Sequence, residues 1–311
     1  MTMRIRGYKK NQRIALCMGD GCGIGNFVQA LPAVQSLYES GNTIDLFISS
    51  FSYGDMAGIV KGQPYIRALY ENTYDSAEEM YDICVVSFLS EHRVAHAKKY
   101  LTLKTNWKKR SEYEQYCWVA EKLGVKNFKP PVINLAKRNF HLKPGNILIH
   151  AGCAQRDYWE RKKWHKYKKL IDILLKDNFT VYCCGKEDEI IDYPGVTPFT
   201  DMPLQETAAL INQCDLFLSN DSGLMHIAAA LRKKQIAVFT ATDHKKSGPY
   251  YNPHARVITP RLKCYPCQGK QEVWDHCTDW LCRQVISEDD VYGEIRKVMD
   301  FKKLTSGSCH G

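Results

Sequence analysis

The sequence lacks the long apolar run, the low-complexity tract and the fixed-period repeat that mark several classes of protein. No apolar segment in its 311 residues approaches the ~18 residues that cross a membrane, so no transmembrane segment is expected. The N-terminus, MTMRIRGYKKNQRIALCMGD, is basic but reaches only a short apolar run, which argues against a signal peptide. With 44% hydrophobic and 25% charged residues, we expect a globular protein of two domains in the cytoplasm.

Acidic residues are the scarcer charged type, with 34 Asp and Glu against 43 Lys and Arg, and the formal net charge is +9. The excess is uneven. Residues 93–110 carry seven basic side chains and no acid, and residues 156–169 carry seven against two acids. Both runs contain aromatic residues, so they are either solvated helix faces or surfaces that meet an anionic partner.

The chain has thirteen cysteines but is neither short nor visibly secreted, so a disulfide framework is not expected. Several lie inside apolar, strand-like runs and are explained as small core residues. Four near the C-terminus have the spacing C-x2-C-x9-C-x4-C and could hold a structural zinc ion; plain packing or free thiols is the alternative. These four are Cys264, Cys267, Cys277 and Cys282.

Apolar β-branched runs alternate with helical patterns along most of the chain, which indicates the α/β class with parallel sheets. The pattern predicts two doubly wound Rossmann-like domains, residues 1–142 and 143–311, the second with a cysteine-bearing loop and a C-terminal helix. The predicted strands are 13–19, 43–49, 80–88, 147–152, 179–185, 215–221 and 235–241; the predicted helices are 25–41, 111–124, 164–176, 204–213 and 223–233.

The stretch SNDSGLMHIAAAL, residues 219–231, lies at one of the predicted strand-to-helix junctions. Ligands of parallel sheets bind at such junctions, and free N–H groups at residues 222–224 together with the helix dipole favour a phosphate. His226 could donate to a phosphate oxygen, and Asp221 could accept from sugar hydroxyls. The alternative is that Asp221 and Ser222 only cap the helix and that His226 is an interior residue.

These residues resemble the signature of glycosyltransferase family 9, the heptosyltransferase family of inverting GT-B enzymes. The family pattern NDSGxMHLAAAL, a strand and FGPTDPxxxGPY correspond to NDSGLMHIAAAL, QIAVF and TATDHKKSGPY in this chain. Other elements follow in the family's order: GIGNFVQALPAVQSL (23–37), HAG (150–152), RKKW (161–164), CCGKEDE (183–189) and DMPLQE (201–206). The resemblance implies two domains that face each other across a cleft, the first for the acceptor and the second for a nucleotide-diphosphate sugar.

The resemblance also implies roles for individual residues of the second domain. Lys162 would hold the donor diphosphate, with Lys163 as a neighbour whose role the register leaves open. Asp221 would contact the donor sugar and Met202 would pack near the nucleobase. The remaining diphosphate contacts would be Ser222, Gly223, Leu224 and His226. Because fixed N–H groups and a lysine stabilise charge on the departing phosphate, this chemistry requires no catalytic metal.

The chain departs from the family at the glycine-rich turn of the first domain. The family has an aspartate after GIG, the residue implied as general base, whereas this chain has Asn26 after Gly25, and an amide cannot take a proton. Asp20, in a loop about two residues longer than the family form, is the predicted substitute unless it only caps the following helix. Glu91 and His92, after a predicted strand, are the alternatives on the acceptor side.

Three functions are compatible with these features. The first is transfer of a sugar, with inversion, to an anionic acceptor such as a lipopolysaccharide-core saccharide. The second keeps the chemistry but acts on DNA, at a hydroxylated base such as hydroxymethylcytosine, with residues 93–110 following the backbone. The third is a nucleotide-sugar-binding protein with weak turnover.

Overall fold

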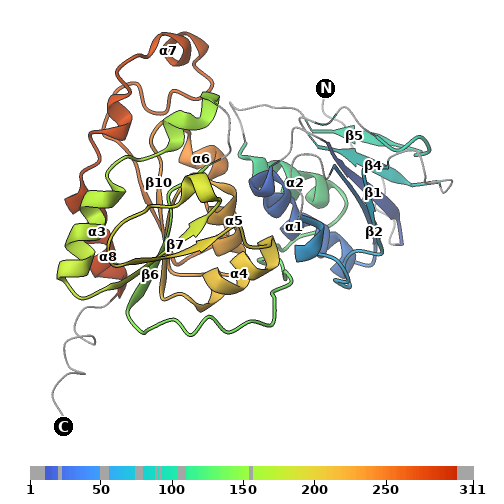
Figure 1. Cartoon of the computed structure of the whole chain (residues 1–311). Coiled ribbons are helices and arrows are strands. Elements are labelled where there is room, and N and C mark those ends of the chain that lie inside the picture. The colour runs from blue at the N-terminus through green and yellow to red at the C-terminus, as the bar shows by residue number, and fades with distance from the viewer. Residues whose placement is uncertain are drawn as a thin grey trace. The chain divides into compact units, whose positions relative to one another are not determined.

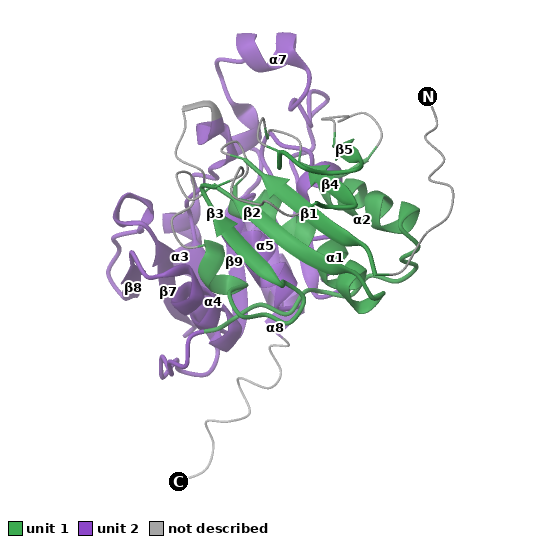
Figure 2. Cartoon of the chain, turned by 90° about the vertical axis from the view of Figure 1, so that its right-hand side faces the viewer, with its two compact units in different colours: residues 1–135 green, residues 136–311 purple. Residues whose placement is uncertain are grey.

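The computed structural model describes residues 11–19, 23–49, 56–73, 80–87, 90, 93–103, 110–153 and 157–299 (Figure 1). The chain divides into two compact units, residues 1–135 and 136–311, coloured separately in Figure 2. The predicted junction near residue 143 lies in the segment between the last helix of unit 1 and the first strand of unit 2. None of the helices in the described segments is long and apolar enough to cross a bilayer.

Unit 1 is built on a parallel sheet of five strands in the order β3-β2-β1-β4-β5. The apolar run after Gln12 forms the central strand, which pairs with β2 on one side and β4 on the other. The elements of unit 1 are β1 (Arg13–Met18), α1 (Ile24–Glu39), β2 (Thr43–Ile48), η1 (Met56–Ile59), β3 (Ala68–Glu71), β4 (Ile83–Val86), β5 (Tyr100–Thr102) and α2 (Glu112–Lys122).

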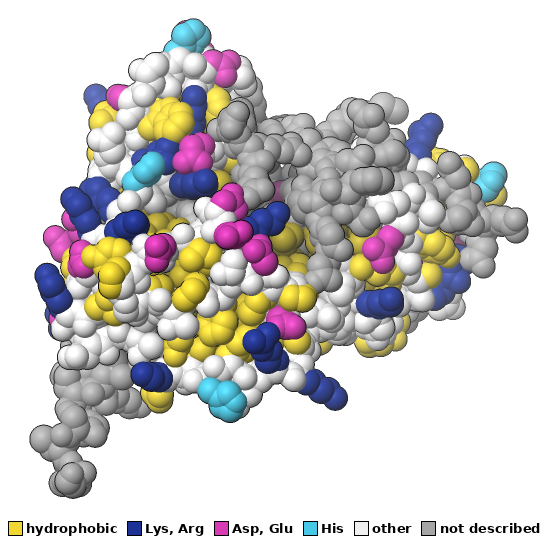
Figure 3. Space-filling view, viewed as in Figure 1, with side chains coloured by type: hydrophobic (Ala, Val, Ile, Leu, Met, Phe, Trp, Pro, Cys, Tyr) yellow, Lys and Arg dark blue, Asp and Glu magenta, His cyan; other side chains and the backbone are white. Residues whose placement is uncertain are grey.

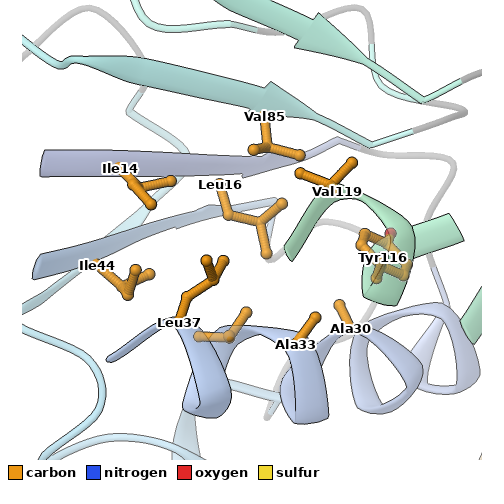
Figure 4. Close-up of a pocket in the computed structure, with 10 residues that line it drawn as sticks. Ile14, Leu16, Ala30, Ala33, Leu37, Ile44, Val85, Tyr116 and Val119 are labelled. Carbon is orange, nitrogen blue, oxygen red and sulfur yellow. The ribbon is translucent and has the colours of Figure 1, made fainter. Parts of the chain in front are cut away.

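Side chains from α1 and α2 point toward β1, β2 and β4 and form an apolar core (Figure 4). The core contains a void of about 20 Å³, room for about one water molecule. The hydroxyl of Tyr116, which borders this void, forms a 2.7 Å hydrogen bond with Ser87. This void belongs to the packing of the unit and is far too small for a sugar.

Unit 2 contains a parallel sheet of six strands in the order β11-β10-β9-β6-β7-β8. Counted from its own first strand, this is the order 6-5-4-1-2-3 of a dinucleotide-binding Rossmann domain. Its elements are β6 (Asn146–His150), η2 (Asp157–Lys162), α3 (Tyr167–Lys176), β7 (Thr180–Gly185), η3 (Glu187–Glu189), β8 (Val196–Thr200), α4 (Leu204–Gln213), β9 (Leu216–Asn220), α5 (Gly223–Ala230), β10 (Gln235–Val238), α6 (His244–Ser247), β11 (Ala255–Ile258), α7 (Gln271–His276), η4 (Leu281–Arg283) and α8 (Glu288–Met299).

Helices cover both faces of the second sheet, as the predicted doubly wound fold requires. Ile236 and Val238 of β10 face a cluster that includes side chains of α3 and α8. Ala237 and Phe239, on the opposite face, pack with Met225 of α5. Since successive side chains of a strand point to opposite faces, β10 is buried on both and reads as a continuous apolar run.

The two basic runs, residues 93–110 and 156–169, are not simply solvated helix faces, which was one of the two interpretations of them. Residues 100–102 of the first run form edge strand β5, and residues 157–162 of the second form the 3-10 helix η2. Helix α3 begins at Tyr167, three residues later than predicted, because Trp164 is buried in the core of unit 2 before the helix starts.

Candidate functional site

The strand order of unit 2 determines where a ligand would bind. The connection from β6 runs to β7 on one side, whereas β9 lies on its other side, so the order reverses between β6 and β9. Ligands of doubly wound sheets bind at this reversal, beyond the carboxyl ends of the strands. β6 ends at His150 and β9 ends at Asn220, which brings HAG and NDSG together from distant parts of the sequence.

The side chain of Asn220, fully buried, joins the segments that surround this edge. Its amide nitrogen donates to the carbonyl of Ala151, 2.6 Å away, in the loop after β6. Its oxygen accepts from the Trp164 backbone N–H at 3.1 Å and from the Tyr167 hydroxyl at 3.0 Å. Asn220 thus fixes the loop after β6 and the start of α3 to the end of β9, although the sequence suggested no role for it.

Ser222 is the N-cap of α5, as one interpretation of the sequence predicted. Its backbone is extended, and its hydroxyl accepts from the N–H of Met225 at 3.4 Å. The first N–H groups of an α-helix have no partner within it, so the start of α5, at Gly223 and Leu224, can donate to an anion. Asp221 does not serve as the N-cap.

Asp221 instead forms a buried ion pair with Lys162. The Lys162 ammonium lies 2.9 Å from Asp221 Oδ2, and the Thr242 hydroxyl donates to the same oxygen at 2.7 Å. The ammonium also lies 4.2 Å from the centre of the Trp159 ring. Thr242 belongs to the TATD segment after β10, so the NDSG, RKKW and TATD segments meet at one carboxylate. The pair holds a lysine beside the start of α5.

His226, in the second half-turn of α5, is buried with 3% of its surface exposed. Burial lowers its pKa from 6.5 to about 4, although the nearby Asp221 carboxylate opposes this effect; Lys162 lowers the pKa further. His226 is therefore neutral at pH 7. Its Nδ1 is buried without a hydrogen-bond partner among the described residues. A neutral imidazole can donate one N–H to a phosphate oxygen without adding charge.

The two candidate lysines of the RKKW element face different partners. Lys162 contacts Asp221, whereas the Lys163 ammonium pairs with Glu160 at 2.8 Å and is 37% exposed. Arg283 also pairs with Glu160 and donates to the Lys163 carbonyl at 2.9 Å. The geometry therefore associates Lys162, and not Lys163, with the end of β9.

Met202, predicted near the nucleobase, follows β8 at the same edge of the sheet and is half-buried. The preceding residue, Asp201, donates its backbone N–H to the carbonyl of Gly185 at the end of β7. Met202 thus lies at the carboxyl edge, two strands from the end of β6. Its role near the nucleobase stays a prediction.

The glycine-rich turn of unit 1 leads from β1 into α1, whose N-cap is Gly23. Asn26 accepts from the Gly23 N–H at 2.5 Å through its side-chain oxygen, and its amide nitrogen donates to a carboxylate oxygen of Glu112. Glu112, at the start of α2, is 4% exposed, and its second oxygen accepts from Gln29 at 3.3 Å. Gly25 lies in the first turn of α1. The Asn26–Glu112 contact joins residues 86 positions apart and was not predicted.

The predicted base Asp20 and its alternatives Glu91 and His92 lie outside the described residues. Their roles on the acceptor side stay predictions.

The four C-terminal cysteines differ in exposure: Cys267 is buried, Cys264 is exposed, and the other two are intermediate. Burial raises the pKa of the Cys282 thiol to about 12, and the charges of the other three thiols add to this effect. Cys282 therefore lies near all of them. Within the described part of the chain, no three Cys, His, Asp or Glu side chains are arranged to hold a metal ion. The zinc interpretation stays a prediction.

Comparison with solved structures defines the class of protein. The crystal structure of a family 9 glycosyltransferase from Veillonella parvula matches with a TM-score of 0.68 at 17% identity, over 94% of this chain and 98% of that one. The E. coli ADP-heptose lps heptosyltransferase II matches with a TM-score of 0.63 at 15% identity, over 94% and 99%. The two parallel-sheet units therefore have the GT-B fold of glycosyltransferases.

The family follows from the sequence. The model of glycosyltransferase family 9 (heptosyltransferase) matches residues 66–278, and the chain belongs to this family. Lipooligosaccharide heptosyltransferase 2 of Campylobacter jejuni serotype O:6 is 34% identical over 85 residues. This alignment spans 27% of the chain and only 26% of the relative's length. The expected resemblance and fold class are confirmed.

The low pKa of His226 predicts a loss of stability in acid. Because the unfolded chain binds the proton near pH 6.5 and the folded chain only near pH 4, the stability present above pH 6.5 is lost as the pH falls toward 4. We expect the His226 contribution to fall by about 2 kcal/mol between pH 7 and pH 5. Urea denaturation of the wild type and His226→Gln at both pH values measures it, and parallel losses in the two proteins would contradict it.

Metal analysis of the purified protein tests the cysteine site. If the four thiols bind zinc, the metal content is near one per chain and falls to near zero in the Cys277→Ser, Cys282→Ser double variant. A wild-type content near zero ends the zinc interpretation and leaves packing or free thiols.

Proposed function

We propose that this protein is a heptosyltransferase that transfers heptose from ADP-heptose to a sugar hydroxyl of a lipooligosaccharide core, with inversion. Membership of family 9 and the names of the aligned relatives support the reaction and the acceptor class. The observation that carries the proposal is the junction of β9 and α5, where free N–H groups, Lys162 and His226 gather at the strand reversal of a Rossmann sheet.

The donor diphosphate would lie against the start of α5, with its oxygens toward the N–H groups of Gly223 and Leu224. Lys162 would exchange part of its contact with Asp221 for the diphosphate, which frees the carboxylate to accept from hydroxyls of the donor sugar. As the bond to the sugar breaks, negative charge grows on the departing phosphate. The hydrogen-bond donors at the start of α5 are already held in place by the helix and by the contacts of Asn220, so they stabilise that charge without reorganising.

A saccharide acceptor is favoured over DNA. The aligned relatives are named as lipooligosaccharide enzymes. On the face of unit 2 in Figure 3, Lys and Arg side chains lie among Asp and Glu side chains, whereas a nucleic-acid backbone calls for a continuous basic track.

The third hypothesis, a binding protein with weak turnover, predicts donor binding without transfer.

The proton of the acceptor hydroxyl requires a base other than Asn26. Two carboxylates are candidates: Asp20, predicted from the sequence, and Glu112, which accepts a hydrogen bond from the Asn26 side chain. In this proposal a carboxylate on α2 or in the longer loop takes over the role of the aspartate that the turn lacks.

Donor binding should depend on Lys162 and not on Lys163. A charged hydrogen bond to the diphosphate contributes about 1.5–3 kcal/mol, so Lys162→Met should weaken ADP-heptose binding roughly 10- to 100-fold. Lys163→Met, the matched control, should change affinity less than about twofold because its ammonium pairs with Glu160 at the surface. Thermal-shift titration measures both, and equal losses in the two variants would contradict the assignment.

Exchanging the candidate carboxylates identifies the base. Asp20→Asn and Glu112→Gln each replace one candidate carboxylate by its amide. The variant that removes the base should have a kcat roughly 10²- to 10⁴-fold lower than the wild type, with donor affinity unchanged. The assay uses ADP-heptose and lipooligosaccharide from a strain that lacks heptosyltransferase 2. If Glu112 is the base, Asn26→Asp should restore turnover to Glu112→Gln, since the double variant returns a carboxylate to the pair. Full turnover in both single variants would remove both residues from the mechanism.

A further inference from the structure

Ser222, His150 and Glu189 form a buried chain of hydrogen bonds at the proposed diphosphate site. His150 Nδ1 lies 3.1 Å from the Ser222 hydroxyl, and its Nε2 lies 3.4 Å from Glu189 Oε2. His150 ends β6, Ser222 caps α5 and Glu189 closes η3, so the chain crosses three elements. The exposed fractions of the His150 and Glu189 side chains are only 5% and 10%.

Two glycines allow Glu189 to reach His150. A Cβ atom at Gly152 would lie 2.2 Å from the Glu189 carboxyl group, and one at Gly185 would lie 2.9 Å from its Oε2. The carboxylate also accepts from the backbone N–H of Lys186 at 2.9 Å. Burial by itself would raise the pKa of Glu189, but the hydrogen bonds from His150 and from the Lys186 N–H, together with the positive charges of these two side chains at acid pH, outweigh burial and lower the pKa. Glu189 is therefore ionised at neutral pH.

The positions of the protons follow from what each group can donate. An ionised carboxylate only accepts, so Nε2 of His150 carries the proton that faces Glu189. In a neutral imidazole Nδ1 is then an acceptor, and within the described segments its hydrogen-bond partner is the Ser222 hydroxyl, which must be the donor. Ser222 also accepts from the Met225 N–H. In the free protein the single hydroxyl proton of Ser222 is thus directed at His150.

A diphosphate at the start of α5 conflicts with this arrangement. Phosphate oxygens only accept, so the Ser222 hydroxyl can contribute only if its proton turns toward the phosphate. Nδ1 of His150 would then face the Ser222 oxygen with no proton between the two atoms. The opposite tautomer does not resolve the conflict, because it would set the Nε2 lone pair against the Glu189 carboxylate. A proton on both nitrogens of His150 satisfies every group.

We propose that His150 is a positioning residue that takes up one proton when the donor diphosphate binds, and that this proton redirects the Ser222 hydroxyl from His150 to the phosphate. The imidazolium donates to Glu189 and to Ser222, and Ser222 donates to the diphosphate. The charge gained lies between two anions, the carboxylate and the diphosphate, which compensates its burial. The inference rests on the proposed function, since it requires a diphosphate at α5.

The surrounding titratable groups do not supply this proton change. Burial raises the pKa of Cys183 and Cys184 on the neighbouring strand β7, and it raises the pKa of Cys153 in the loop after β6 to about 11, so these thiols stay neutral. On the other side Lys162 is paired with Asp221. The hydrogen bond with Glu160 raises the pKa of Lys163, so this lysine stays a cation in the neutral range.

Calorimetry of ADP-heptose binding in two buffers of different ionisation enthalpy counts the protons taken up. A nucleotide sugar is the suitable probe because its diphosphate has no terminal phosphate that titrates near pH 7. For the wild type we expect uptake of up to one proton, and an affinity that falls by up to about tenfold per pH unit above neutrality. His150→Asn, whose amide can donate to Ser222 without titrating, should bind with no uptake and with affinity independent of pH.

Two further variants separate this linkage from a purely structural role. Glu189→Gln can donate to Nε2, which leaves Nδ1 free to carry the proton in neutral His150, so it should also bind without uptake. His254→Gln, which replaces an exposed histidine that has no part in the proposed site, is the matched histidine control and should retain the uptake. Wild-type binding with no buffer dependence, or equal uptake in His150→Asn, would overturn the inference. Absence of any ADP-sugar binding would instead reject the proposed function.

Discussion

The hydrogen bonds of the Asn220 side chain are the constraint on which the proposed donor site depends. A buried amide has two donors and two acceptor positions, and leaving them unpaired costs about 1–3 kcal/mol. Here they join the end of β9 to the loop after β6 and to the start of α3. This arrangement brings HAG and RKKW, which are both far from α5 in the sequence, beside the N-terminus of that helix. A substitution at Asn220 would loosen the site without touching any group that contacts the donor.

Charge in the site is balanced before any ligand binds. Lys162 is matched by Asp221, burial and the lysine keep His226 neutral, and Glu189 is compensated by hydrogen bonds. An incoming diphosphate therefore meets the N–H groups of α5 and the Lys162 ammonium, which is already paired with Asp221. One added proton on His150 would compensate part of the negative charge that the diphosphate brings. The free protein thus has no uncompensated charge among these groups, and its hydrogen-bond donors still point to the start of α5, where the diphosphate would bind.

How much the sequence could predict depends on burial. The central strands β1, β2, β4, β6, β7, β9 and β10 were predicted because they are buried on both faces and read as apolar runs. All four edge strands, β3, β5, β8 and β11, were missed; their residues are mostly half-buried or exposed and carry no such run. The helix α4 was predicted with its observed bounds, whereas α3 was extended over Trp164, an apolar residue that belongs to the core but precedes the helix.

The site could be predicted in part for a similar reason. Asp221, Ser222 and His226 belong to a recognisable motif that follows a strand end, and Lys162 belongs to a second motif in the segment after β6. The parallel sheet brings the ends of these two strands together. The contacts of Glu189 with His150 and of Glu112 with Asn26 join segments 39 and 86 residues apart, so no local pattern could reveal them. Choosing Lys162 over Lys163 likewise required the geometry, since adjacent lysines have the same chemistry and differ only in direction.

A crystal structure of the protein with ADP would test the central claim most directly. The account predicts that the diphosphate lies against the N–H groups of Gly223 and Leu224, with the Lys162 ammonium and the Ser222 hydroxyl within hydrogen-bonding distance of its oxygens. ADP bound elsewhere, with the start of α5 empty and the Lys162–Asp221 pair unchanged, would contradict it.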